Sequence, residues 1–287
     1  RPELYNLKVL KKPPLIPRKL RLTVSERIAP DGSVIEPLEL SDLEKAVKKL
    51  KEEKVRSVAV LFLNSYAHAI HEKKAASFIR SRMPDTYISV SSEILPEFRE
   101  FERLSTTVLN AYLGPVMTEY IKDLLYEMRA GGIEAVLRIC QSDGGVTSPG
   151  TTLDYPVRTL YSGPAAGVIG AAALFGEEYE DLVTLDMGGT STDISLVQGS
   201  HAVLTTGKEV DDCPIRFPAV DITTIGAGGG SIASVDEGGF LRVGPKSMGA
   251  DPGPACYGKG GQEPTVTDAS LVSGLLEPNM SLGGDIR

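Results

Sequence analysis

The stretch that decides the fold is residues 182–197, which read Leu182-Val-Thr-Leu-Asp-Met-Gly-Gly-Thr-Ser-Thr-Asp-Ile-Ser-Leu-Val197. One apolar segment precedes the Gly-Gly pair, another follows it, and a turn of glycines and hydroxyl residues joins them. This pattern predicts a β-hairpin. Each predicted strand meets the turn at an aspartate, Asp186 on one side and Asp193 on the other. Both carboxylates are therefore expected at the same end of the hairpin.

The predicted turn has the chemistry of a phosphate-binding loop. Gly188 and Gly189 lack a Cβ, so their N–H groups can approach a phosphate closely. The hydroxyls of Thr190, Ser191 and Thr192 can add further donors. We therefore predict that this turn cradles phosphate.

The two aspartates are candidate Mg²⁺ ligands, because a hard cation and its waters require carboxylate oxygen. An ordinary hairpin with a Gly-Gly turn and capping aspartates is the alternative interpretation of the same spacing. Two adjacent carboxylates repel each other unless a cation joins them. This repulsion favours Asp186 and Asp193 as a metal-binding and catalytic pair.

A second glycine run, Ile225-Gly-Ala-Gly-Gly-Gly-Ser231, follows the strand-like residues 219–222. Such a run can also be a flexible or tightly packed turn. Two glycine-rich sites in one segment favour a shared phosphate ligand. The candidate nucleotide-facing residues are therefore Gly226, Gly228, Gly229 and Gly230.

Glycine and charge both change along the chain near residue 130. Residues 1–130 contain 2 of the 30 glycines and balance 22 basic against 18 acidic residues, a charge of +4. Residues 131–287 contain the other 28 glycines and 8 basic against 20 acidic residues, a charge of −12. This shift predicts two domains, residues 1–130 and residues 131–287.

The periodicity of apolar residues predicts strands alternating with helices, and hence an α/β fold. Strands are expected at 22–24, 34–35, 58–63, 87–90 and 135–139, and helices at 41–54, 71–82 and 165–174. A further helical region, 105–129, should be interrupted at Gly114-Pro115, because proline removes a helix hydrogen bond.

Composition excludes several classes of function. The net charge of −8 disfavours nonspecific binding to nucleic acid or to an anionic membrane surface. No apolar run approaches the 18 or so residues that span a bilayer. The three cysteines are widely spaced and include no CxxC pair, which favours a reducing compartment, the cytoplasm by default.

The chain resembles the hydantoinase A/5-oxoprolinase family, within the actin, sugar kinase and Hsp70 ATPase superfamily. Besides residues 186–193, the segments that carry the resemblance are Glu97–Arg103, Asn110–Leu113, Gln141–Gly145, Ser162–Ala165, Gly226–Ser231 and Gly249–Gly258. The resemblance implies an actin-like, ribonuclease H-like ATPase lobe with part of a second lobe. It also implies ATP and Mg²⁺ as cofactors, a small cyclic amide as substrate, a second hydantoinase B-like subunit or domain, and an oligomer.

In that family, ATP is thought to phosphorylate the amide carbonyl oxygen of a hydantoin or of 5-oxoproline. By this logic Gly188, Gly189, Thr190 and Thr192 would hold phosphate, and the two aspartates would hold Mg²⁺ or orient water. A ketone carboxylase subunit, a small-molecule kinase and a non-enzymatic nucleotide switch remain alternatives. The family's earlier Asp-x-Gly-Gly-Thr hairpin is absent before residue 186, which indicates an internal fragment.

Two further residues have competing interpretations. Arg103 could grip a carboxylate in a substrate clamp, although the charged run 97–103 favours a solvated helix start. Cys256 lies in a turn-rich loop and could be a nucleophile, but no histidine follows His201 to lower its pKa. A structural role is expected for Cys256.

Overall fold

The computed structural model describes residues 13–210 and 213–278. The chain forms two compact units. The first comprises Arg1–Ala135, Gly150–Val157 and Lys208–Arg216, and the second comprises Val136–Pro149, Arg158–Gly207 and Phe217–Arg287. The domain boundary expected at residue 130 stays a prediction.

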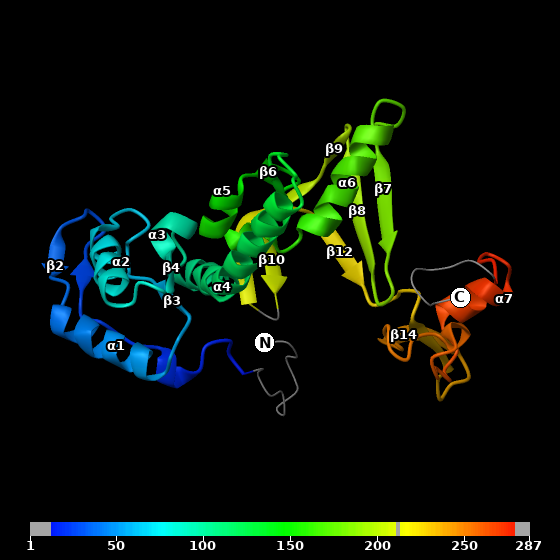
Figure 1. The fold of residues 1–287 in the computed structure, drawn as a ribbon, viewed down its shortest axis with the longest axis horizontal. Coiled ribbons are helices and arrows are strands. Elements are labelled where there is room, and N and C mark those ends of the chain that lie inside the picture. Colours follow the sequence, from blue (N-terminus) through cyan, green and yellow to red (C-terminus); the bar gives the residue numbers. More distant parts are fainter. Residues whose placement is uncertain (1–12, 211–212, 279–287) are drawn as a thin grey trace. The chain divides into compact units, whose positions relative to one another are not determined.

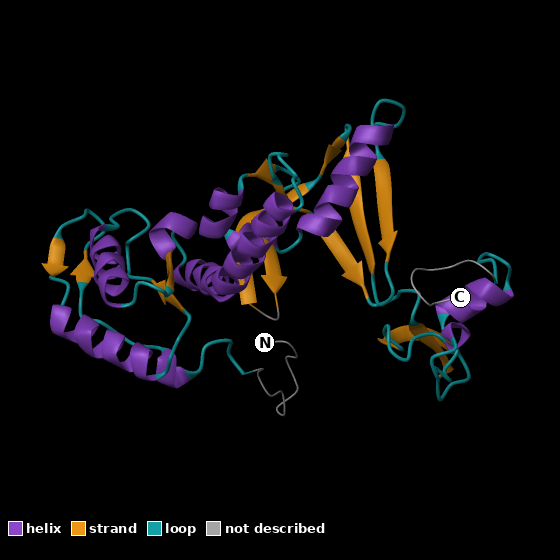
Figure 2. Cartoon of the chain, in the orientation of Figure 1, coloured by secondary structure: helices purple, strands orange, loops and turns teal. Residues whose placement is uncertain are grey.

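The first unit is built on helices around a short parallel β-pair (Figures 1 and 2). Its elements are η1 (Arg18–Leu20), β1 (Arg27–Ile28), β2 (Val34–Glu36), α1 (Leu40–Glu52), β3 (Ser57–Val60), α2 (Ile70–Arg82), β4 (Tyr87–Val90), α3 (Ser91–Ile94) and α4 (Glu100–Ala130). The parallel strands β3 and β4 are joined through α2. Leu43, Val47 and Leu50 of α1 pack with Ala75 and Ile79 of α2 in one apolar core. The spacing of these apolar residues explains why both helices formed where the periodicity predicted them.

Helix α4 corrects the prediction of an interruption at Gly114-Pro115, because it runs unbroken through Pro115. The hydroxyl of Thr118 donates to the Gly114 carbonyl, 2.7 Å away, inside the same stretch. Gly114 lies against the ring of Tyr87, where a Cβ would come within 2.4 Å of ring carbons. The pair therefore serves the packing of α4 on β4 and does not end the helix.

The first predicted hairpin is also displaced. Its strands are Arg27–Ile28 and Val34–Glu36, so the strand expected at 22–24 is wrong. Asp31 holds the connecting turn by accepting hydrogen bonds from the N–H and hydroxyl of Ser33. These bonds stabilise the turn that joins the two strands.

The second unit carries most of the strands. Together with the segments that cross between the units, its elements are β5 (Ile139–Cys140), β6 (Val146–Thr147), α5 (Pro149–Asp154), η2 (Pro156–Thr159), α6 (Ser162–Phe175), β7 (Leu182–Met187), β8 (Thr192–Gln198), β9 (His201–Ala202), β10 (Leu204–Val210), β11 (Cys213–Val220), β12 (Ile222–Ile225), β13 (Ser231–Val235), β14 (Leu241–Ser247), η3 (Ala255–Tyr257) and α7 (Val266–Val272). Its main sheet has the order β12-β8-β7, with β9 also paired to β8.

Helix α6 lies along this sheet (Figure 1). Ala165 and Val168 of α6 pack against Val197 of β8 and Val220 of β11. Small residues on α6 let the helix approach the strands closely, as its Gly- and Ala-rich sequence predicts. The α/β fold class is confirmed. None of the helices in the described residues combines the length and the apolar character needed to cross a membrane.

Candidate functional site

The predicted hairpin is confirmed and consists of β7 and β8. The strands are antiparallel, and Asp186 of β7 lies directly opposite Asp193 of β8. The N–H of Gly188 donates to the carbonyl of Ser191 at 2.9 Å and closes the turn. Residues directly opposite each other in an antiparallel pair share a face of the sheet. The fold thus brings the two carboxylates side by side, as the sequence pattern indicated.

Strand β12 adds a third polar group to this row. Thr224 is the partner of Asp193 on the other side of β8, and its hydroxyl donates to Asp193 Oδ1 at 2.6 Å. The carboxylate of Asp186, in contrast, has no hydrogen-bonding or ionic partner within residues 13–210 and 213–278. One carboxylate is therefore held in place and the other is free to bind a ligand.

The second glycine run packs on the hairpin turn. The N–H of Gly229 donates to the carbonyl of Gly188 at 2.9 Å, and the N–H of Gly230 donates to the carbonyl of Gly189 at 2.6 Å. From the other side, the buried hydroxyl of Thr192 donates to the carbonyl of Ala227. The two glycine-rich segments, about 40 residues apart in sequence, form one local structure.

Close approach of backbone to backbone explains the glycines of the second run. A Cβ on Gly228 would lie 2.7 Å from the carbonyl oxygen of Gly188 and from the nitrogens of Thr190 and Ser191. A Cβ on Gly230 would lie 2.9 Å from the carbonyl oxygen of Gly189. Any side chain at these positions would force the two turns apart.

The hydrogen bonds also divide the predicted phosphate donors into two groups. The N–H groups of Gly228, Gly229 and Gly230 are already used, the first by the hydroxyl of Ser231. Gly189 and Thr190 are exposed, and within the described part of the chain their N–H groups meet no acceptor. The free donors thus belong to the first turn, while Thr192 and the second run support it.

Gly226 follows β12 and lies near Pro245, which a Cβ would approach to 3.6 Å. Its own carbonyl faces Gly244, where a Cβ would come within 2.6 Å of the oxygen. Gly226 therefore joins the sheet to the β13–β14 hairpin and is set apart from the Gly189–Thr190 donors by its packing.

A cavity of about 390 Å³ lies between α6 and the sheet. Asp186 and Asp193 line it together with mostly apolar residues, which are Pro164, Gly167, Val168, Ala171, Phe175, Leu182, Val183, Thr184, Leu185, Ser195 and Ile222. The carboxylate pair thus stands beside a space bounded by low-polarity groups. Electrostatic interactions of these carboxylates are stronger there than in bulk water.

The expectation that Arg103 belongs to a solvated helix start is wrong. Its side chain is fully buried, its Nη2 donates to the carbonyl of Phe62 at 2.7 Å, and its guanidinium lies over the ring of Tyr66. Glu97, from the same charged run, pairs with Arg216 at 2.8 Å. Arg103 holds the loop after β3 against α4.

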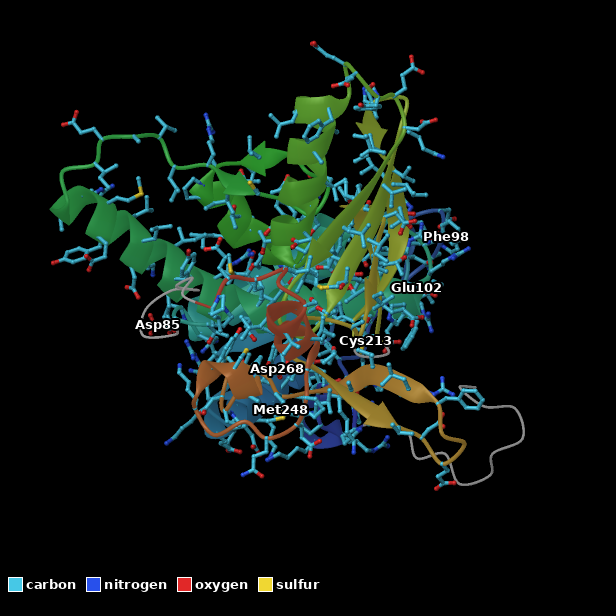
Figure 3. The ribbon with its side chains drawn as sticks, turned by 90° about the vertical axis from the view of Figure 1, so that its right-hand side faces the viewer. Asp85, Phe98, Glu102, Cys213, Met248 and Asp268 are labelled. Atoms are coloured by element: carbon cyan, nitrogen blue, oxygen red, sulfur yellow. The ribbon has the colours of Figure 1, made fainter. Side chains whose placement is uncertain are left out.

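Cys256 has the environment of a structural thiol. Its N–H donates to Asp268 Oδ1 at 2.7 Å, and Asp268, labelled in Figure 3, also closes a capping box with Thr265 at the start of α7. Burial, together with the neighbouring Asp268 carboxylate, raises the pKa of the Cys256 thiol to about 11. A thiol with such a pKa is a poor nucleophile at neutral pH.

The sequence analysis missed two threonines that contact the candidate site. Thr224 contacts Asp193, and Thr267 donates both its N–H and its hydroxyl to the carbonyl of Gly229. Neither threonine lies in a distinctive motif. Only the register of β12 against β8 and the position of α7 bring them to the site.

Comparisons with known proteins match both parts of the chain. The sequence model described as "Hydantoinase/oxoprolinase" matches residues 103–287, and that described as "Hydantoinase/oxoprolinase N-terminal region" matches residues 1–83. Caprolactamase subunit alpha from Pseudomonas jessenii is 42% identical over 280 residues, which are 95% of this chain and 39% of the relative. 5-oxoprolinase 1 from Arabidopsis thaliana is 37% identical over 86% of this chain and 19% of its own length.

Solved structures agree with these matches. The crystal structure of ATP-dependent caprolactamase from Pseudomonas jessenii superposes with a TM-score of 0.82 at 39% identity, covering 99% of this chain and 41% of that one. Nucleotide-free acetone carboxylase superposes with a TM-score of 0.76 at 26% identity, covering 93% of this chain and 38% of that one. The chain thus spans about two fifths of the length of these structures.

Proposed function

Because the chain belongs to the hydantoinase/oxoprolinase family, we propose that the intact protein uses ATP to open a small cyclic amide. One observation carries the proposal. Asp186 lies opposite Asp193, its carboxylate has no bonding partner in the described residues, and the adjacent glycine turn has exposed N–H groups with no acceptor in those residues. The names of the caprolactamase and 5-oxoprolinase relatives support the substrate class. Both are enzymes named for the ring-shaped amide on which they act.

The nucleotide phosphates would lie on the turn between β7 and β8. Gly189 and Thr190 would donate to phosphate oxygen through their backbone N–H groups, and the exposed Thr190 side chain could add its hydroxyl. Gly188 closes the turn, while Thr192 and Gly228–Gly230 keep it in shape. Donors that are already in position stabilise developing charge without reorganising during the reaction.

The residues present fit Mg²⁺. Mg²⁺ is usually held by one or two carboxylates together with substrate phosphates and waters. Asp186 and Asp193 supply such a pair, and the described residues hold no group of three or more His, Cys, Asp or Glu arranged for a metal. When bound with the nucleotide, Mg²⁺ would neutralise part of the phosphate charge.

The proposed reaction follows from the polarity of an amide. The carbonyl oxygen attacks the γ-phosphorus of ATP, the bond to the β-phosphate oxygen breaks, and ADP leaves. Water then adds to the activated carbon and the ring C–N bond breaks, which leaves an open-chain acyl phosphate with a free nitrogen group. A second water hydrolyses the acyl phosphate and releases phosphate and the ring-opened acid. The turn residues would hold the γ-phosphate in line for the first step, and positioning of this kind supplies most of the catalysis in phosphoryl transfer.

Ketone carboxylation is a second candidate, favoured by a specific relative. The acetophenone carboxylase gamma subunit from Aromatoleum aromaticum is 37% identical over 98% of this chain. Activation of an oxygen by phosphate is common to both reactions. The two differ in whether bicarbonate is consumed.

We also propose that the intact protein works with a second subunit or domain. The caprolactamase and acetophenone carboxylase relatives are named as subunits. The free thiols of Cys140, Cys213 and Cys256 support the cytoplasm as its compartment.

The test measures products of the intact protein, together with its second subunit, on hydantoin, 5-oxoproline and caprolactam with ATP and Mg²⁺. We expect phosphate and a ring-opened acid in equal amounts with at least one ring. Asp186→Asn should abolish both. Product formation that requires bicarbonate and a ketone would favour the carboxylase, and a stable phosphate ester or substrate-independent hydrolysis would contradict both proposals.

A further inference from the structure

The two exposed N–H groups of the hairpin turn each belong to a peptide group whose carbonyl is already hydrogen-bonded. The N–H of Thr190 shares its peptide group with the carbonyl of Gly189, and the N–H of Gly189 shares its own with the carbonyl of Gly188. These carbonyls accept hydrogen bonds from the N–H groups of Gly230, at 2.6 Å, and Gly229, at 2.9 Å. A carbonyl that accepts a hydrogen bond polarises the N–H of the same peptide group, because the two are conjugated through the C–N bond. The second glycine run therefore strengthens both exposed donors.

The same arrangement repeats one step further from the turn. The N–H of Gly230 shares its peptide group with the carbonyl of Gly229. That carbonyl accepts two hydrogen bonds from Thr267 of α7, one from its N–H and one from its hydroxyl, each 2.8 Å long. A series of polarised peptide groups thus leads from Thr267 through Gly229 and Gly189 to the N–H of Thr190. Each hydrogen bond in such a series strengthens the next, by roughly 10–30%.

A second series ends at the other exposed donor and consists of backbone groups alone. It begins at the N–H of Met248, which donates to the carbonyl of Gly230, and passes through the N–H groups of Ser231 and Gly229 before it reaches Gly189. Its three hydrogen bonds are 2.8, 3.0 and 2.9 Å long. Because no side chain takes part, this series is an internal reference for the first.

We propose that Thr267 is a positioning residue for the nucleotide phosphates, whose hydroxyl polarises the Thr190 N–H through two peptide groups. Thr267 acts through the backbone and not by contact with phosphate. The carbonyl of Gly229 has two lone pairs, so it accepts the hydroxyl in addition to the N–H of the same threonine. This inference rests on the proposed function, because it takes the hairpin turn as the phosphate site.

A hydroxyl that only fastened α7 to the glycine run would have a different effect. Its loss would loosen Gly229, which takes part in both series, and would disturb the N–H groups of Gly189 and Thr190 alike. A polarising hydroxyl affects only the series that passes through the carbonyl of Gly229. The N–H of Gly229, which leads to Gly189, lies in a different peptide group. The two roles of Thr267 can therefore be distinguished by comparing the two exposed amides.

The test compares hydroxyl deletions on α7 in the intact protein. Thr267→Val and Thr267→Ala remove the hydroxyl and keep the N–H, whereas Thr267→Ser keeps both donors. Ser270→Ala is the matched control, because the Ser270 hydroxyl donates at 2.9 Å to the carbonyl of Val266 inside the same helix. The first readout, without nucleotide, is the proton chemical shift of the Thr190 and Gly189 amides, followed with isotope-labelled threonine and glycine. The second is the affinity for Mg-ATP, measured by titration calorimetry.

We expect Thr267→Val and Thr267→Ala to shift the Thr190 amide proton upfield, because a less polarised N–H is more shielded, and to leave the Gly189 amide unchanged. Mg-ATP should bind both variants about 3-fold to 10-fold more weakly. Thr267→Ser and Ser270→Ala should behave like the unsubstituted protein.

Three results would overturn the inference: equal shifts at both amides, an unchanged Thr190 shift, or a loss of affinity in Ser270→Ala as large as in Thr267→Val. The shifts are read without nucleotide, so they decide this inference even where the intact protein binds no Mg-ATP. Absence of Mg-ATP binding would refute the proposed function instead.

Discussion

The row formed by Asp186, Asp193 and Thr224 shows how single residues set the chemistry of the hairpin. Two carboxylates on paired positions would repel each other, and the hydroxyl of Thr224 occupies only one oxygen of Asp193. The remaining oxygens face a space in which a cation would relieve the repulsion.

Asp186→Asn should remove the free carboxylate while preserving its shape. Loss of a charged contact costs roughly 1.5–3 kcal/mol, and each 1.4 kcal/mol changes affinity tenfold. We therefore expect Mg-ATP to bind the intact protein about 10-fold to 100-fold more weakly, measured by titration calorimetry. Unchanged affinity and turnover would refute the assignment of Asp186 as a metal ligand.

Thr224→Val should loosen Asp193 by deleting its 2.6 Å hydrogen bond. Binding of Mn²⁺ with nucleotide, followed by electron paramagnetic resonance in the intact protein, should weaken by about 10-fold. Thr224→Ser should restore it. Thr223→Val is the matched control, because adjacent residues of a strand point to opposite faces. An equal effect of both valine variants would indicate general damage to β12.

Cys256 should resist alkylation at pH 8. Its raised pKa, about 11, means that the thiol stays protonated until the pH approaches that value, so the reactive thiolate is scarce below it. Iodoacetamide should modify the exposed Cys140 first and Cys256 only as the pH rises above 10, as peptide mass spectrometry can establish. Cys256→Ser should keep its activity. Complete inactivation with folding intact would restore the nucleophile interpretation.

At the scale of elements, helix α4 illustrates how packing overrides local propensity. Pro115 lacks the N–H that would bond to the turn before it, yet the helix continues for all 31 residues. The helix contacts β3 and β4, and burial of Leu109, Ala111 and Ile121 stabilises it. Tertiary packing supplies most of the stability of helices in proteins.

Gly114→Ala should destabilise the chain although alanine favours helices. The new methyl group would lie 2.4 Å from ring carbons of Tyr87, whose hydroxyl is held by the carbonyl of Leu153 at 2.8 Å. We expect a loss of about 1–3 kcal/mol in the free energy of unfolding, measured with urea. Gly170→Ala in α6 is the control and should stabilise by up to about 1 kcal/mol, because no atom lies near its new Cβ. Stabilisation by both variants would contradict the packing argument.

At the scale of the whole molecule, the proposed function requires more than this chain holds. The turn between β7 and β8 would supply one set of phosphate donors, and relatives with more than twice the matched length have further chain that could supply others. An open site also leaves the phosphates exposed to water, which weakens every electrostatic contact. We therefore expect the proposed reaction only from the intact protein.

The 287-residue chain by itself should fold, bind ATP weakly or undetectably, and show no turnover. Each missing charge-assisted hydrogen bond costs roughly 1.5–3 kcal/mol, so the absence of several removes most of the affinity. Far-ultraviolet circular dichroism and a phosphate-release assay measure the two properties. Steady ATP hydrolysis by the purified chain would show that residues 1–287 are sufficient.

The sequence by itself determined the helices and the hairpin that form from short-range patterns of apolar residues and glycines. The Gly188-Gly189 pair between alternating segments predicted the β7–β8 hairpin with its opposed aspartates, and apolar spacing predicted α1, α2 and α6. The periods of two and 3.6 residues are visible within a few turns of chain, because they reflect which face of each element is buried. The hairpin and the opposed position of its two aspartates could therefore be predicted before any contact was known.

Tertiary structure alone decided which residues meet across long separations. It packed the second glycine run against the first, so that the N–H groups of Gly229 and Gly230 donate to carbonyls of the hairpin turn. It also placed the Thr224 hydroxyl within hydrogen-bonding distance of Asp193. It also buried Arg103, which local charge had placed in solvent. Such contacts depend on the register of strands and on the packing of surfaces far apart in the chain, and neither leaves a periodic signal in the sequence.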